Sequence, residues 1–225
     1  MRLTDLDPRI LASPLWLEAL THRSAGSRHN ERLEFLGDSV LSLVVTERIY
    51  TSLPQANEGD LSRLRASLVN KEALAQLAKE LGMGEVIRLG PGELKSGGFR
   101  RNSILADALE AVIGAVYLVN GLEAAREFIE RIYGERLSNP PSLRGLKDPK
   151  SRLQELLQGR GLALPEYRVT EVHGDPHNQT FTAACAVSGL DIEAVGRGTS
   201  RRKAEQDAAA RALAQIEGEA GGERA

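Results

Sequence analysis

The segment 102–119 constrains the fold most, because it is apolar around its whole circumference and carries only two charges, Asp107 and Glu110. A helix without a polar face must lie inside a domain. The two acids are three residues apart and therefore share one face of that helix. Buried carboxylates of like charge repel each other and lose hydration unless cations compensate them. The alternative is that arginines from elsewhere in the chain, such as Arg63, Arg65 or Arg100, pair with these acids.

A second acidic helix is predicted over 30–50, with Asn30 as its N-cap. Glu31, Glu34 and Asp38 are spaced at i, i+3 and i+7, so they lie on one stripe of this helix. Further along, the helix is apolar almost all round, which places its carboxylates in a crowded environment of low dielectric constant. Glu31 and Glu34 could instead be first-turn acids that the helix dipole favours. Asp38 lies beyond that turn and has no lysine or arginine four residues away on either side.

If the two acidic faces meet, the carboxylates surround a volume lined only with oxygen ligands, contributed by Glu34, Asp38, Asp107 and Glu110. Such ligands suit Mg²⁺, with Mn²⁺ as a plausible substitute, and do not suit zinc. Carboxylate clusters that hold two such ions about 3.5–4 Å apart hydrolyse phosphodiester bonds. The expected chemistry is therefore phosphoryl transfer to water.

Gly37 stands inside the first acidic helix, where glycine costs about 1 kcal/mol relative to alanine. A glycine at such a position usually permits the close approach of another group. We expect a neighbouring backbone to contact Gly37, and the alternatives are a helix kink or simple tolerance.

The chain divides into two parts. Helical periodicity dominates the first 135 residues, over 15–19, 30–50, 59–70, 71–82, 102–119 and 121–136. The stretch 138–149 holds three prolines and a glycine, which indicates a boundary. A helix capped by Asp148 follows, then three strands over 166–173, 179–188 and 190–196, and an alanine-rich helix over 200–216. We predict an all-α domain at 1–137, a linker at 138–147, a small α+β domain of α-β-β-β-α order at 148–217, and a frayed, disordered tail at 218–225.

Overall composition excludes several classes of protein. The net charge of −2 and the pI near 6.1 do not announce nucleic-acid binding, so any basic surface must be local. The single cysteine, Cys185, excludes an internal disulfide and a multi-cysteine zinc site. Neither a secretory signal nor eighteen uninterrupted apolar residues are present. We expect a cytoplasmic protein without membrane association or an organic cofactor.

Several motifs together resemble the ribonuclease III family. They are NERLEFLGDS at 30–39, ALTHRSA at 19–25, EGDLSRLRA at 58–66 and SILADALEAVIGAVY at 103–117. The resemblance continues into the α-β-β-β-α part, which resembles the double-stranded RNA-binding domain, so that the whole is similar to the short bacterial form. It implies a homodimer with two active sites, each of which cuts one strand of double-stranded RNA and leaves 5′-phosphate and 3′-hydroxyl ends. Precursors of ribosomal RNA and other structured RNAs are the substrates it suggests.

The resemblance also assigns roles to acidic residues of the first domain. The family's metal ligands match Glu34, Asp38, Asp107 and Glu110, with Asp38 and Glu110 as the catalytic pair and Glu110 the most sensitive to substitution. Glu31 and Glu58 match supporting acids, although Glu58 could equally be a solvated loop residue.

The resemblance further implies that the signature helix lies at the dimer interface, with Phe35 and Gly37 as contact positions.

Basic residues open the last helix of the second domain. Arg201, Arg202 and Lys203 oppose the helix dipole in its first turn, which is unfavourable for stability alone and favours a phosphate clamp, with Ser200 as a further donor. A solvated charged face is the alternative. By resemblance, Gln154, Glu155 and His177 match the positions that contact the minor groove of A-form RNA.

Two other functions remain to be weighed. A double-stranded RNA-binding regulator without cleavage activity would have lost part of the acid set, which is complete here. A helical metal enzyme that hydrolyses nucleotides would leave the second domain unexplained.

Overall fold

The computed structural model describes residues 3–139, 145, 147–175 and 177–222. The chain forms two compact units, Met1–Leu146 and Lys147–Ala225. This division falls within the expected linker 138–147, of which residues 140–144 and 146 lie outside the described part.

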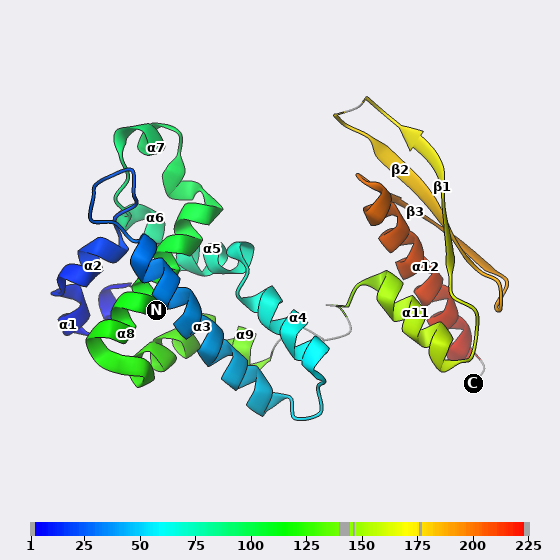
Figure 1. The fold of residues 1–225 in the computed structure, drawn as a ribbon, viewed down its shortest axis with the longest axis horizontal. Coiled ribbons are helices and arrows are strands. Elements are labelled where there is room, and N and C mark those ends of the chain that lie inside the picture. Colours follow the sequence, from blue (N-terminus) through cyan, green and yellow to red (C-terminus); the bar gives the residue numbers. More distant parts are fainter. Residues whose placement is uncertain (1–2, 140–144, 146, 176, 223–225) are drawn as a thin grey trace. The chain divides into compact units, whose positions relative to one another are not determined.

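The described elements of unit 1 are helices, as predicted (Figure 1). They are η1 (Leu3–Asp5), α1 (Pro8–Leu11), α2 (Pro14–Ala19), α3 (Glu31–Ser52), α4 (Glu58–Leu68), α5 (Lys71–Glu80), α6 (Met83–Val86), α7 (Pro91–Lys95), η2 (Gly98–Arg100), α8 (Asn102–Tyr133) and α9 (Glu135–Ser138).

Helix α8 is the core of unit 1 and packs against α3 and α5. Nearly all its residues from Ile104 to Val116 are buried, which confirms the predicted interior helix. Gly121, at φ 82° and ψ −179°, breaks α8, so its two halves correspond to the helices predicted over 102–119 and 121–136. The second half ends at Tyr133, three residues earlier than predicted. By length and composition, α8 is the one helix in the described ranges that could cross a membrane. Most of the qualifying stretch is buried in the core, as in an ordinary core helix.

Two glycines let α3 and α8 touch through their backbones. A Cβ atom at Gly37 would lie 1.7 Å from the backbone oxygen of Glu110, and one at Gly114 would lie 2.4 Å from the backbone oxygen of Leu33. Only a residue without a side chain fits at such separations. The close approach predicted at Gly37 is confirmed, and its neighbour is α8 of the same chain. This contact brings the acidic faces of both helices together.

Asparagines precede three helices of unit 1, but only two of them cap through their side chains. Asn57 accepts a hydrogen bond from the backbone N–H of Asp60, and Asn70 accepts one from that of Ala73, both at 2.9 Å. The cap predicted at Asn30 is wrong, because its backbone is already helical and its side chain makes no capping bond. That side chain is buried, with the residue only 2% exposed.

Unit 2 has the predicted α-β-β-β-α order. Helix α11 (Pro149–Gly159) begins at the predicted cap, where Asp148 accepts from the backbone N–H of Lys150 at 2.9 Å. Strands β1 (Glu166–His173), β2 (Thr180–Val187) and β3 (Ile192–Gly198) form an antiparallel sheet in that order, and helix α12 (Arg201–Gly222) packs on it and against α11. The core includes Leu153, Leu157, Cys185, Ala208 and Ala212.

Two elements of unit 2, β3 and α12, differ most from the predicted bounds. Strand β3 begins and ends two residues later than expected, because the turn before it extends to Asp191, whose φ of 51° is left-handed. Helix α12 continues to Gly222, so the tail expected to fray from Gly218 is helical up to that point. The last residues of the predicted tail, 223–225, lie outside the described part.

Candidate active site

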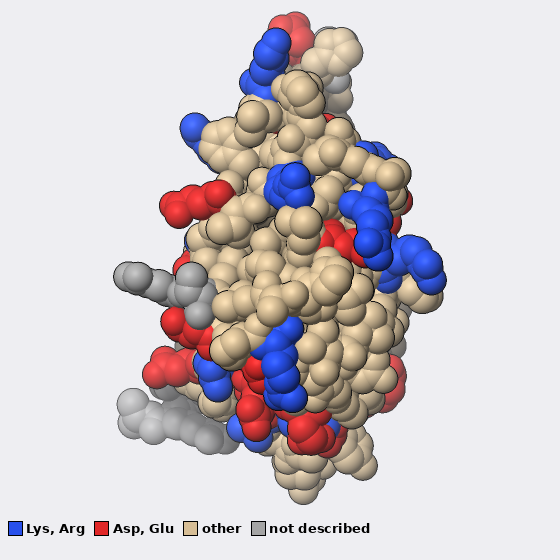
Figure 2. Space-filling view, turned by 90° about the vertical axis from the view of Figure 1, so that its left-hand side faces the viewer, with Lys and Arg blue, Asp and Glu red and all other residues tan. Residues whose placement is uncertain are grey.

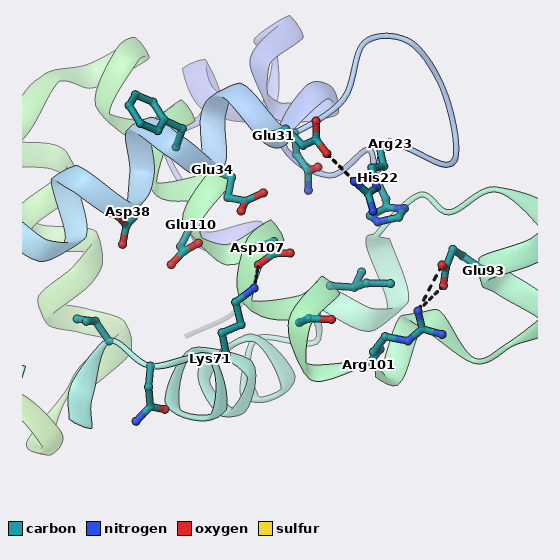
Figure 3. Close-up of a pocket in the computed structure, with 16 residues that line it drawn as sticks. His22, Arg23, Glu31, Glu34, Asp38, Lys71, Glu93, Arg101, Asp107 and Glu110 are labelled. Atoms are coloured by element: carbon teal, nitrogen blue, oxygen red, sulfur yellow. Dashed lines mark hydrogen bonds and ion pairs between the residues drawn. The ribbon is translucent and has the colours of Figure 1, made fainter. Parts of the chain in front are cut away.

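Three carboxylates from two helices converge at the contact of α3 with α8. Oxygen atoms of Glu34 on α3 and of Asp107 and Glu110 on α8 all lie within 4.8 Å of one another. Figure 3 shows these side chains directed toward one another from the two helices. They line a cavity of about 930 Å³, and all three are half-buried. Three of the four predicted metal ligands are therefore brought together.

The protonation of these carboxyl groups reflects their crowding. Burial raises the pKa of Glu110 to about 8, and the neighbouring carboxylates, Asp38 first, add to the rise. Burial also raises the pKa of Glu34, and Asp107 adds to it. Charge repulsion and loss of hydration both disfavour the ionised forms. A bound cation relieves both effects, and an all-oxygen set of half-buried ligands fits Mg²⁺ or Mn²⁺.

Asp38 lies beside this cluster at its solvent edge. It lines the cavity and acts on Glu110 through its charge, but it does not belong to the set of oxygens within 4.8 Å of one another. The expectation that Asp38 is buried in a crowded environment is wrong, since its side chain is exposed.

Lys71 is the cation that pairs with the cluster in the described part of the chain. Its Nζ lies 3.2 Å from Oδ1 of Asp107, as Figure 3 shows. The arginines considered as partners are engaged elsewhere. Arg63 pairs with Asp60 at 2.7 Å, Arg65 bonds Thr46 at 3.4 Å, and Arg100 lies over the ring of Phe99 at 4.9 Å.

Sequence reasoning missed Lys71, and one signal could have found it. Lys71 is the first residue of α5, directly after the cap Asn70, where a positive charge opposes the helix dipole. Arg23 and Arg101, which also line the cavity, were missed as well. They pair with Glu31 at 3.3 Å and with Glu93 at 3.1 Å, respectively.

The two supporting acids differ in position. Glu31 lines the cavity, is exposed and pairs with Arg23. Glu58 is not among the residues that line the cavity. As the first residue of α4, it accepts a hydrogen bond from the Ser62 hydroxyl at 2.6 Å. The structure therefore brings Glu31, but not Glu58, to the acidic cavity.

The two expected dimer contacts also differ. Phe35 projects from α3 with 77% of its surface exposed. Gly37 is buried against α8 of the same chain, and its expected place in a dimer interface stays a prediction. The need for glycine at position 37 comes from packing within one chain, which the resemblance alone did not reveal.

The expected RNA-contacting residues of unit 2 lie on its surface. Gln154 and Glu155 are exposed on α11, and His177 is exposed between β1 and β2. The basic side chains of Arg201, Arg202 and Lys203 are exposed in the first turn of α12, where the Ser200 hydroxyl accepts from the backbone N–H of Lys203 at 3.3 Å.

The basic turn is less unfavourable for stability than the sequence suggests. Arg201 pairs with Glu205 at 2.8 Å, and Arg202 lies 3.7 Å from Asp148. These acids offset the repulsion between the cations and the helix dipole. Arg201 and Arg202 therefore have ion-pair partners within unit 2 in addition to the predicted phosphate contact.

Charges elsewhere are mixed in sign. Figure 2 shows acidic and basic side chains interspersed over one face of the molecule, with uncharged surface between them. On that face, the described basic residues do not merge into one continuous field. This agrees with the net charge of −2 and with the inference that any basic surface is local.

Comparison with known families agrees with both units. Residues 13–137 match the family described as ribonuclease-III-like, and residues 149–216 match the double-stranded RNA binding motif. An all-helical domain followed by an α-β-β-β-α domain agrees with this pair of matches. The chain belongs to the ribonuclease III family.

Individual relatives span nearly the same length. A protein named Ribonuclease 3 from Vibrio cholerae is 58% identical over 198 residues, which is 88% of each chain. Another from Photobacterium profundum is 56% identical over 206 residues, or 92% of each. A crystal structure of the nuclease domain of ribonuclease III from Campylobacter jejuni is 41% identical and has a TM-score of 0.55. It covers 62% of this chain and 97% of that one.

A second structure of that domain concerns flexibility in a region involved in dimer formation. It is 47% identical with a TM-score of 0.53, over 54% of this chain and 85% of that one.

Proposed function

We propose that the protein is an endoribonuclease that hydrolyses phosphodiester bonds of double-stranded RNA with a divalent metal ion, leaving 5′-phosphate and 3′-hydroxyl ends. The observation that carries the proposal is the convergence of Glu34, Asp107 and Glu110 in one cavity. The same chain carries a double-stranded RNA binding motif, which supports RNA duplexes as the substrate class. Mg²⁺ is the proposed ion, and Mn²⁺ its substitute.

The residues of the cavity have different proposed roles in hydrolysis. Glu34, Asp107 and Glu110 would hold the divalent ion, which when bound supplies positive charge near the attacking water and the leaving oxygen. Asp38, exposed beside Glu110, is placed to accept a hydrogen bond from a water molecule at the mouth of the cavity. The attacking water forms a bond to phosphorus and gives up a proton to solvent, while the bond from phosphorus to the 3′ oxygen breaks and that oxygen takes up a proton from solvent.

Unit 2 would hold the RNA duplex through its shape. Arg201, Arg202 and Lys203 would bind phosphate oxygens, and the regions of Gln154 and His177 would contact the minor groove, as double-stranded RNA-binding domains do. Exposure of these side chains supports this assignment. Phosphate contacts give affinity without base specificity.

A homodimer is the proposed assembly, with Phe35 as a contact. Its 77% exposure on α3 supports this role, because a large aromatic side chain in water favours an interface. Sedimentation of a Phe35→Ala variant tests it. Dissociation at concentrations where the wild type sediments as a dimer is expected, and an unchanged dimer would remove Phe35 from the interface.

Cytoplasmic processing of ribosomal and messenger RNA precursors is the proposed cellular role. The buried free thiol of Cys185 is compatible with a reducing compartment.

The decisive experiment incubates purified protein with a long RNA duplex in Mg²⁺ or in EDTA, beside a Glu110→Gln variant. Cleavage that requires Mg²⁺ and leaves 5′-phosphate ends is expected, with a loss of about 10³-fold or more in the variant. A single strand of the same sequence is the substrate control. Wild-type protein that binds the duplex in Mg²⁺ without cutting it would instead be a non-cleaving RNA-binding regulator.

A further inference from the structure

Lys71 occupies a position that helix stability does not explain. It is the first residue of α5, where the helix dipole disfavours a cation. Its side chain nevertheless reaches the acidic cavity and pairs with Asp107 at 3.2 Å. Attraction by the carboxylates outweighs the unfavourable interaction with the helix dipole, so the ammonium group lies at the cavity and pairs with its acids.

The geometry of the Lys71–Asp107 ion pair allows the lysine side chain to move away from Asp107. The Lys71 side chain is 65% exposed, whereas that of Asp107 is 26% exposed, so the lysine approaches from the solvent side. A four-carbon stem lets the ammonium group move without moving the helix. The Asp107 carboxylate that it contacts belongs to the cluster that could hold a metal ion.

Before a metal ion binds, Lys71 is the cation that reduces repulsion among the acidic groups of the cavity. Glu34, Asp107 and Glu110 form the cluster and Asp38 stands beside it, so these acidic groups outnumber the one ammonium group, that of Lys71, which pairs with the cluster. The lysine reduces the repulsion among them while leaving a net negative site. A divalent cation brings more charge, and it would bind the Asp107 carboxylate that Lys71 contacts.

We propose that Lys71 is an exchangeable counter-cation of the acidic cluster, which neutralises Asp107 in the metal-free protein and is displaced from it when a divalent cation binds. The inference rests on the proposed metal site. It makes Lys71 a positioning residue that stabilises the metal-free domain and lowers the affinity for the metal.

The test compares two lysines of one helix in the full-length protein without RNA. Lys71→Met removes the counter-cation. Lys79→Met is the matched control, because Lys79 also lies on α5 but bonds Asn102 at 2.7 Å and does not line the cavity. Calorimetric titration with Mn²⁺ should show about three- to tenfold tighter binding for Lys71→Met, the range expected for loss of a competing, partly exposed ion pair. Lys79→Met and the charge-conserving Lys71→Arg should bind like the wild type.

Thermal unfolding separates this role from a merely structural one. In EDTA, Lys71→Met should melt at a lower temperature than the wild type, because the cluster has lost its counter-cation. In saturating Mn²⁺ that difference should disappear, because the metal has already displaced Lys71. An equal loss in both conditions, or unchanged or weaker Mn²⁺ binding, would overturn the proposal. A wild-type protein that binds no Mn²⁺ would refute the metal site of the proposed function as well.

Discussion

Two glutamates, one in each unit, show opposite ways of placing a carboxylate away from water. Glu205 in unit 2 lies between Lys150 at 2.5 Å and Arg201 at 2.8 Å, and these bonds, that of Arg201 first, lower its pKa. Glu110 in unit 1 lies among other carboxylates, and its pKa rises to about 8. In the first arrangement, cations of the same unit neutralise the carboxylate, and the ion pairs stabilise the fold. In the second arrangement, the neighbouring carboxylates do not neutralise Glu110, and such an uncompensated group is typical of a ligand-binding site.

Both units also contain glycines at which two elements touch through their backbones. In unit 1, Gly37 meets the backbone of α8. In unit 2, a Cβ atom at Gly196 on β3 would lie 2.1 Å from the backbone nitrogen of Ala208 on α12. The contact in unit 1 determines the separation of the acidic helices, whereas the contact in unit 2 seats a helix on its sheet.

The largest effect is expected from Gly37→Ala, which removes the contact that assembles the acidic site. The added methyl group would overlap the backbone of Glu110, and α3 and α8 must separate. We expect a loss of about 3 kcal/mol in the free energy of unfolding, with loss of Mg²⁺-dependent cleavage. Urea unfolding measures the first quantity. Gly59→Ala is the control, because its nearest contact is 3.4 Å; equal behaviour of the two variants would contradict the packing argument.

Glu205→Gln should be the next most damaging change, because it removes the carboxylate that pairs with both cations. Lys150 and Arg201 would both lose their shared anion, and we expect unit 2 to lose about 2 kcal/mol at pH 7. Since the folded-state pKa of Glu205 is lowered, its contribution is present above the pKa of an unfolded glutamate and is lost as the pH falls through the folded value. Urea unfolding at pH 7 and at pH 3 measures both statements.

Glu217→Gln is the control for that variant. Glu217 also lies on α12 and pairs with an arginine, Arg152 at 3.1 Å, but its side chain is 49% exposed. A change within about 0.5 kcal/mol is expected there. If both variants lose equal stability, burial of the pair is not what matters.

Glu110→Gln should have the opposite sign in metal-free protein. The folded-state pKa of Glu110 is raised to about 8, so the folded form holds a proton that the unfolded form has released. Stability in EDTA therefore falls as the pH rises from about 4.5 to about 8. The variant lacks this loss and should melt a few degrees (~2–5 °C) above the wild type at pH 8.5. The two curves should converge near pH 5, and parallel curves would contradict the assignment.

The smallest effect on stability is expected from Arg202→Ala, whose pair with Asp148 is exposed and 3.7 Å long. Unfolding should change by less than about 0.5 kcal/mol. Binding to RNA duplexes should nevertheless weaken for all sequences alike, and the slope of log K against log salt should become shallower by about 1. Filter binding at several salt concentrations measures this. An unchanged slope would leave Arg202 without a phosphate contact.

Much of the local structure could be predicted from sequence because periodicity is a local property. The apolar run around Asp107 and Glu110 required a buried helix, and residue spacing placed the two acids on one face of it. Strand β1 occupies the predicted residues 166–173, and Asp148 caps α11 as expected. In each case the deciding interactions lie within a few residues along the chain.

Tertiary structure alone decided which partner each of these residues meets. Position 37 requires glycine because α8 returns to it from more than seventy residues away, and Lys71 reaches Asp107 across 36 residues. Asp38 is exposed although its spacing matches the stripe. Spacing determines the face on which a side chain lies. The partner on that face depends on how distant segments pack, which no local pattern records.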